Sequence, residues 1–123
     1  EPTPWTDELK EIKRSIEAKA AISFNSVLIN YYRDGQDRVA WHSDDEKELG
    51  QNPVIGSVSF GAERIFKLRH KKYKTNNLKQ SVMLGNGSFL LMKGATQHHW
   101  VHEIPRTAKL IGPRINLTFR VIK

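Results

Sequence analysis

A histidine and an aspartate two positions apart are the first residues of this sequence whose types and spacing could do chemistry together. They are His42 and Asp44, in the run Trp41-His42-Ser43-Asp44. Alternate residues of an extended strand project to the same face, so the imidazole and the carboxylate can bind one cation. Such a pair also arises often without any function, as polar residues at the end of a strand.

A metal site of this kind needs a second histidine from elsewhere in the chain. Two histidines and one carboxylate on one face of an octahedral Fe(II) leave three positions open for a bidentate cosubstrate and O₂. The sequence contains no cysteine, which excludes thiolate zinc sites, iron–sulfur clusters and disulfides. The candidates are His70, His98, His99 and His102. We predict His102, because the run 100–104 has the pattern of a late strand. His98 and His99 follow a turn-like stretch and are expected in a surface loop.

A strand near the C-terminus carries two arginines on one face. Alternation over residues 114–120 puts Arg114, Asn116, Thr118 and Arg120 on one side and Ile115, Leu117 and Phe119 on the other. Two guanidinium groups inside a barrel would need anions. The 2-oxoglutarate dianion supplies them, since a planar guanidinium can hold a carboxylate by two parallel hydrogen bonds. A surface strand with solvated arginines is the alternative. Asn30 and Tyr32, also two apart, share one face of an early strand.

The elements that must position these residues are one helix and many short strands. Thr6 can cap a helix over residues 6–20, whose apolar residues fall on one face. From Ser26 onward the pattern predicts strands over residues 26–33, 38–42, 54–60, 63–69, 80–84, 88–92, 99–104 and 114–122. Many short strands separated by turns are typical of a barrel or jelly roll, so we predict a mainly β fold with the helix packed outside.

Length and composition favour one compact domain spanning residues 1–123, of which 38% are hydrophobic. No apolar stretch reaches the roughly 18 residues of a membrane span, and residues 1–4 show no signal-peptide pattern. We therefore expect a soluble intracellular protein, cytoplasmic or nuclear, with no membrane partner and with a monomer favoured. The opening without an initiator methionine suggests a piece of a longer protein that lacks some N-terminal sequence.

Positive charge dominates the composition. The formal net charge of +7 favours a polyanionic partner, although composition alone does not separate nucleic acid from an anionic membrane or from general solubility. The densest basic run has no acidic residue and consists of Arg64, Lys67, Arg69, Lys71, Lys72, Lys74 and Lys79, with Tyr73 among them. Lys67 and Arg69 face away from the apolar residues of the expected strand and could contact phosphates. A solvated hairpin is the alternative.

Five phrases of the sequence combine into a specific pattern. They are Asn30-Tyr31-Tyr32-Arg33, Trp41-His42-Ser43-Asp44-Asp45-Glu46, Ser57-Val58-Ser59-Phe60-Gly61-Ala62, Gly94-Ala95-Thr96-Gln97 and Arg114-Ile115-Asn116-Leu117-Thr118-Phe119-Arg120. An HxD pair, a late histidine and an RxNxTxR run in this order resemble the AlkB family of Fe(II)- and 2-oxoglutarate-dependent dioxygenases, which repair alkylated nucleic acid. The resemblance covers nearly everything from Ser26 to Lys123 and implies a double-stranded β-helix, or jelly roll.

The resemblance implies a role for each matching position. The iron ligands, and so the catalytic centre, would be His42, Asp44 and His102. Arg114 would pair with the distal carboxylate of 2-oxoglutarate, and Arg120 would lie near its oxalyl end. The cofactors implied are therefore Fe(II), 2-oxoglutarate as cosubstrate, and O₂.

Further positions are assigned in the same way. Hydrogen bonds to the cosubstrate would come from Asn30, Tyr32 and Asn116. Asp45 matches an acidic position near the target base, where a carboxylate favours a cationic methylated adenine or cytosine over the neutral base. Contacts to the nucleic-acid substrate are also expected from Arg64, Lys67 and Arg69.

The implied activity is oxidative demethylation of bases of the 1-methyladenine or 3-methylcytosine type in alkylated DNA or RNA. 2-Oxoglutarate and O₂ become succinate and CO₂, and the methyl group leaves as formaldehyde. Family members usually have an N-terminal lid over the nucleotide, and this chain begins too late to contain most of it. Two alternatives remain open: a 2-oxoglutarate-dependent oxygenase acting on protein or a small molecule, and a noncatalytic basic module that binds nucleic acid.

Overall fold

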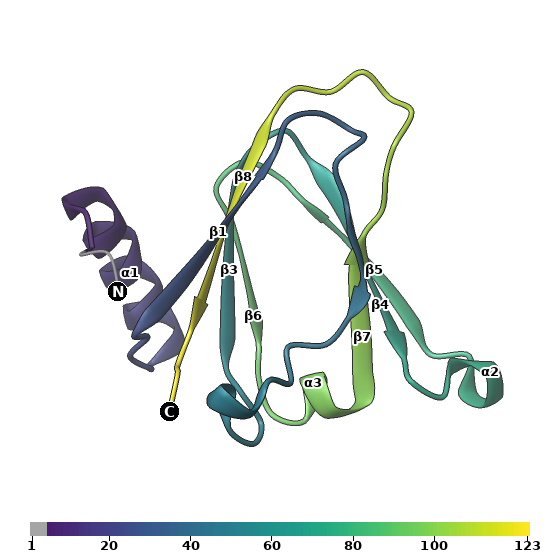
Figure 1. Ribbon diagram of the computed structural model, residues 1–123, viewed down its shortest axis with the longest axis horizontal. Helices are drawn as coiled ribbons and strands as arrows, with labels where there is room; N and C mark the ends of the chain where they lie inside the picture. Colours follow the sequence, from purple (N-terminus) through teal and green to yellow (C-terminus); the bar gives the residue numbers. More distant parts are fainter. Residues whose placement is uncertain (1–4) are drawn as a thin grey trace.

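Two four-stranded antiparallel sheets face each other in the computed structural model, which describes residues 5–123 (Figure 1). One sheet has the strand order β1-β8-β3-β6 and the other β2-β7-β4-β5. The principal elements are α1 (Asp7–Ala20), β1 (Ser26–Tyr32), β2 (Val39–His42), β3 (Ile55–Gly61), β4 (Arg64–His70), β5 (Lys79–Leu84), β6 (Ser88–Met92), β7 (Trp100–Ile104) and β8 (Arg114–Arg120). The predicted mainly β fold is confirmed, with every strand within two residues of its expected ends. Residues 1–4, where no signal-peptide pattern was found, lie outside the described residues.

Strand β8 is hydrogen-bonded along both edges because it lies between β1 and β3 in the first sheet. Its outward-facing Leu117 and Phe119 are buried, with Phe119 fully inaccessible to solvent. Its inward-facing Arg114 and Asn116 are buried as well. The alternation predicted for this strand is therefore correct, and its polar face points into the space between the sheets. A surface strand with solvated arginines is excluded by this burial.

Helix α1 covers the outer face of the first sheet, as predicted (Figure 1). Its buried Ile16 belongs to an apolar cluster with Phe24, Val58, Leu117 and Phe119. Trp5, just before the helix, stacks on Phe119 with 6.1 Å between ring centroids. Burying this apolar layer outside the sheet leaves the opposite, inner face free to carry polar groups.

Thr6 begins the helix, and its loss gives a first testable prediction. Its side-chain Oγ1 accepts a hydrogen bond from the backbone N–H of Leu9 at 3.2 Å. Thr6→Ala leaves that N–H without its cap and is expected to lower the free energy of unfolding by about 1 kcal/mol. Urea denaturation measures the effect, with Ser15→Ala on the exposed face of the same helix as control. An equal change in both variants would show that the cap contributes nothing.

Three short helical segments were not predicted: η1 (Lys47–Leu49), α2 (Tyr73–Asn76) and α3 (Thr96–His99). Each is at most one turn long and is closed by local backbone bonds, such as Asn77 N–H to Tyr73 O at 2.8 Å. A single turn is too short to show a helical periodicity in the sequence. Within residues 5–123, no helix combines the length and the hydrophobicity needed to cross a membrane.

Candidate metal and cosubstrate site

Three side chains that could hold a metal ion meet between the two sheets. They are His42 at the end of β2, Asp44 two residues further on, and His102 in the middle of β7. His42 Nε2 lies 3.9 Å from one Asp44 carboxylate oxygen, and His102 Nε2 lies 3.6 Å from the other. These separations exceed a hydrogen bond, which leaves room for a cation between the three groups. In the part of the chain that the structure describes, no other group of three or more His, Asp or Glu residues has metal-binding spacing.

A β-bulge in β2 turns His42 toward His102. Val39 pairs with Ile104 and His42 pairs with His102, so β2 advances three residues where β7 advances two. One extra residue on β2 bends the strand and re-aims the side chains that follow it. Val39 and His42 both line a cavity between the two sheets, where Val39 also packs against the apolar core. Trp41 lies instead against the side chain of Arg69.

The ring nitrogens of both histidines are arranged for metal binding. His42 Nδ1 lies 2.8 Å from the backbone carbonyl of Ala40, which can only accept, so Nδ1 donates there and Nε2 is the nitrogen that faces Asp44. Burial, and then the neighbouring His42, lower the pKa of His102 to about 4. His102 is therefore neutral at pH 7, which is the form that coordinates a metal. Burial raises the pKa of the Asp44 carboxyl, and a cation would stabilise its charged form.

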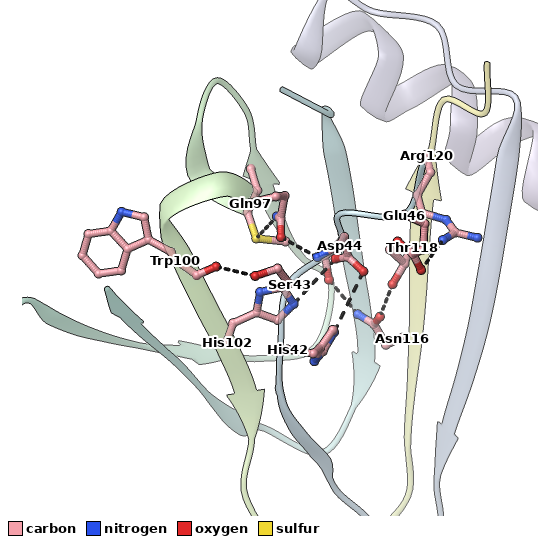
Figure 2. A network of polar contacts seen from close by, with 12 residues as sticks. His42, Ser43, Asp44, Glu46, Gln97, Trp100, His102, Asn116, Thr118 and Arg120 are labelled. Atoms are coloured by element: carbon pink, nitrogen blue, oxygen red, sulfur yellow. Dashed lines mark hydrogen bonds and ion pairs between the residues drawn. The ribbon is translucent and has the colours of Figure 1, made fainter. Parts of the chain in front are cut away.

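The loop that carries Asp44 is held by two hydrogen bonds (Figure 2). Ser43 Oγ donates to the carbonyl of Trp100 at 2.8 Å, and the backbone N–H of Asp44 donates to Gln97 Oε1 at 2.8 Å. Gln97 belongs to one of the runs that resemble the AlkB family, but no function was predicted for it. The signal available was a polar residue next to a strand end, which is too common to single out.

His70, His98 and His99 stand apart from this site. His98 and His99 are exposed, as predicted, although they lie in the short helix α3 rather than in a loop. His70 stacks on His99 with 5.9 Å between ring centroids and packs edge-on against Trp100. Its Nδ1 accepts a hydrogen bond from the backbone N–H of Lys72, so it takes part in shaping the β4–β5 connection.

Arg114 offers an anion site in the same cavity. It is 2% exposed, lies against the ring of Tyr32 at 4.8 Å, and donates from Nη2 to Ser59 Oγ at 2.8 Å. Its Nε and Nη1 are buried without a protein partner. Burial lowers the pKa of Arg114. Buried donors of this kind need an acceptor, and a carboxylate matches the geometry of a guanidinium.

The remaining predicted cosubstrate residues line the cavity beside Arg114. Asn30 and Tyr32 project from β1 into it, and in the strand pairing they lie opposite Asn116 and Arg114. Asn116 Nδ2 donates to Ser57 Oγ at 2.7 Å and is thereby oriented. The face predicted for Asn30 and Tyr32 is therefore the one observed.

Arg120 lies at the other end of β8, next to the loop that carries Asp44. Its Nη1 is 3.9 Å from the exposed carboxylate of Glu46, and its Nε is buried without a partner. Arg114 and Arg120 are six residues apart on β8, and Arg120 is the one that reaches the segment of Asp44 and Glu46. Such an arrangement can hold the two ends of a small dianion.

Arg64 does not occupy the position predicted for it. It is 3% exposed, and its guanidinium donates to the carbonyls of Asp34, Asp37 and Pro105 at 2.7–3.3 Å. It also lies 5.5 Å from the ring of Tyr32. A side chain buried and engaged in this way cannot reach a phosphate, so the expected substrate contact is wrong. Arg64 instead joins the loops that follow β1 and β7.

Lys67 and Arg69 extend from the opposite face of the same strand. The Arg69 guanidinium contacts two aromatic rings, with its carbon 4.1 Å from the Trp41 ring and 4.3 Å from the Tyr73 ring. Lys67 pairs across the sheet with Glu103. Asp45 is exposed directly after Asp44. The expected contacts of these three residues with a nucleic acid stay predictions.

Together, a metal site of two histidines and one carboxylate and a pair of inward-facing arginines in a double-stranded β fold define a class of protein. Residues 1–120 match the 2OG-Fe(II) oxygenase superfamily, and the chain belongs to it. The chain is 44% identical to alpha-ketoglutarate-dependent dioxygenase alkB homolog 3 of Mus musculus, over 99% of this chain and 45% of that protein. It is 42% identical to the DNA oxidative demethylase ALKBH2 of Homo sapiens, over 98% of this chain and 48% of that protein.

These relatives confirm the AlkB resemblance seen in the motifs. The chain spans about half the length of the curated relatives it matches. The solved structure of OsALKBH1 has the same fold, with a TM-score of 0.73 at 21% identity over 98% of this chain and 66% of that one.

Proposed function

We propose that residues 1–123 form the single catalytic core of an oxidative demethylase that acts on alkylated DNA or RNA. One observation carries the proposal: His42, Asp44 and His102 share a cavity with Arg114, whose Nε and Nη1 lack a protein acceptor. A noncatalytic binding module would have no use for a cation site beside a buried guanidinium with two nitrogens that lack an acceptor. We further propose an intracellular location, cytoplasmic or nuclear, and a monomer.

Different residues of the site would bind the metal and the cosubstrate. His42, Asp44 and His102 would hold Fe(II), and Arg114 would bind the distal carboxylate of 2-oxoglutarate. Asn30, Tyr32 and Asn116 would orient the cosubstrate, and Arg120 would neutralise its oxalyl end. When bound, Fe(II) and 2-oxoglutarate supply the activation of O₂ that oxidises a methyl group. In the overall reaction, a methylated base, O₂ and 2-oxoglutarate would give the unmethylated base in the strand, formaldehyde, succinate and CO₂.

Substrate selection would depend on the negative charge of Asp45, next to the metal ligand Asp44. Asp45 is exposed and directly follows Asp44, and its carboxylate would contact a base extruded toward the metal site. A ring-methylated adenine or cytosine is cationic and would be favoured there over the neutral base. One relative is named a DNA oxidative demethylase, which supports a nucleic-acid substrate.

The outer face of β4 would contact the nucleic-acid backbone. The rings of Trp41 and Tyr73 both lie against the Arg69 guanidinium, which restrains it, and its outer nitrogens would donate to phosphate. Lys67, on the same face of the strand, adds a second positive charge. Unlike Arg64, both residues are only partly buried.

Lys67→Ala/Arg69→Ala is expected to weaken single-stranded oligonucleotide binding and its salt dependence. Each lost phosphate contact lowers the slope of log affinity against log salt by about 0.7 for a single strand, so the double variant should lose about 1.4. Fluorescence anisotropy at several salt concentrations measures the slope. The matched control is Lys10→Ala/Arg14→Ala, which removes the same charge from the exposed face of α1. Equal losses in both variants would mean that net charge alone binds the oligonucleotide.

The activity itself is tested with Fe(II) loaded anaerobically and a single-stranded oligonucleotide carrying 1-methyladenine or 3-methylcytosine. Succinate and formaldehyde should form in equal amounts and only with the methylated oligonucleotide. Absence of both products from loaded protein would remove the proposal. Succinate formation without any oligonucleotide binding at low salt would instead indicate an oxygenase of protein or small molecules. Oligonucleotide binding without metal uptake would indicate a noncatalytic module.

A further inference from the structure

Gln97 is a buried polar residue whose side chain contacts the segment that carries Asp44. It is 1% exposed and belongs to α3, five residues before His102 in the chain. Its Oε1 accepts from the backbone N–H of Asp44 at 2.8 Å, and its Nε2 lies 3.4 Å from the sulfur of Met92 (Figure 2). Both ends of the amide are therefore engaged. The orientation of the amide follows from these partners, since a flipped amide would set its NH₂ group against the N–H of Asp44.

A buried amide is costly unless its polar atoms are paired, so this position has a reason to be polar. A methionine or leucine would fill the same space without the cost. The only strong acceptor bond that the Gln97 side chain makes among the described residues is the one from Asp44. The sulfur of Met92 is a weak acceptor. The polarity of this position therefore serves mainly the backbone of a metal-binding residue.

The segment that follows β2 has no regular structure of its own to fix Asp44. Residues 43–46 are neither helix nor strand. Besides Gln97, the segment is held by Ser43, whose Oγ donates to the carbonyl of Trp100 at 2.8 Å. Both anchors lie in residues 97–100, which lead directly into the strand that carries His102. The position of Asp44 is thus tied to the element that supplies another metal ligand.

We propose that Gln97 is a positioning residue of the metal site: its amide fixes the backbone of Asp44 so that the carboxylate faces His42 and His102. This rests on the metal site of the proposed function. Partners of metal ligands that lie outside the coordination sphere commonly change metal affinity by about 10–100-fold. Gln97 would act through the main chain of the metal ligand Asp44 and not through its coordinating carboxylate.

Cobalt(II) affinity tests the proposal without any turnover. Gln97→Met keeps length and burial but removes the acceptor, and is expected to weaken Co(II) binding by about 10–100-fold, measured by calorimetry and by the visible spectrum of bound Co(II). Gln97→Glu keeps an oxygen facing the N–H of Asp44 and should recover most of the affinity. Met92→Leu is the matched control, because it removes only the sulfur partner and conserves volume. Its affinity should equal the wild-type value.

The outcomes separate the proposal from the metal site itself. Tight Co(II) binding by wild type and equally tight binding by Gln97→Met would overturn the role of Gln97. No Co(II) binding by wild type would remove the metal site of the proposed function. Amide exchange in the metal-free wild type decides the role of Gln97 even if cobalt does not bind or a variant does not fold. A slowed amide of Asp44 supports the bond to Gln97, and exchange at the rate of an unprotected chain contradicts it.

Discussion

Asp44→Ala is expected to abolish tight Fe(II) binding and, with it, succinate formation. The carboxylate lies between the Nε2 atoms of His42 and His102, at 3.9 Å and 3.6 Å, so it is the group that joins the two imidazoles into one site. Losing a partner outside the coordination sphere already costs about 10–100-fold in affinity. Losing the only anionic ligand should therefore cost at least about 100-fold. Anaerobic calorimetry with Fe(II) gives the affinity, and succinate release gives the activity.

Stability separates a lost ligand from a damaged fold. Burial raises the pKa of Asp44, so the charged carboxylate is disfavoured in the metal-free protein and its removal should not lower the melting temperature. Asp45→Asn is the matched control, since it changes the neighbouring exposed carboxylate and should leave Fe(II) affinity unchanged. Wild-type Fe(II) affinity in Asp44→Ala would show that another group completes the site.

Most of the fold was predictable because strands with one apolar face leave a clear period of two. Strand β8 shows this best, since its polar and apolar residues alternate without a break, and at its centre Asn116 and Leu117 on opposite faces are both buried. The bulge in β2 was not predictable. It depends on the pairing of His42 with His102, which involves a strand about sixty residues away. The one-turn helices were missed because a four-residue segment carries no periodicity.

The candidate site was predictable where spacing alone determines the face of a strand. On β8 the even spacing of Arg114 and Asn116 puts both side chains into the cavity that His42 and His102 line. Asp44 meets His42 as predicted, although it lies just beyond the end of β2. Arg64 was misassigned because it was grouped with its basic neighbours by charge. Arg64 is two residues from Phe66 on the same strand, so alternation predicts that both side chains point to the inner face, and the sequence already contained this information. Gln97 had no such signal, since its partner is a backbone N–H that only the folded chain brings near.

Arg114→Met is expected to raise the 2-oxoglutarate concentration needed for half-maximal activity by about 100-fold while making the metal-free protein no less stable. A charge-assisted pair in a buried site is worth about 2–5 kcal/mol when one partner is removed, and each 1.4 kcal/mol is tenfold. In the metal-free fold the guanidinium has two donor positions without a partner, so burying methionine there should raise the free energy of unfolding by ~1 kcal/mol. Activity and stability should thus change in opposite directions.

Arg114→Lys distinguishes charge from geometry at the same position. Lysine keeps the positive charge but cannot form two parallel bonds to one carboxylate, so a loss of about tenfold is expected. Arg33→Met, which removes an exposed guanidinium paired with Asp37, should leave the 2-oxoglutarate dependence unchanged. Titration with 2-oxoglutarate under saturating Fe(II) measures all three variants. If Arg114→Met kept the wild-type dependence, the carboxylate would have to bind elsewhere in the cavity, and the buried guanidinium would be left without a function that offsets its desolvation.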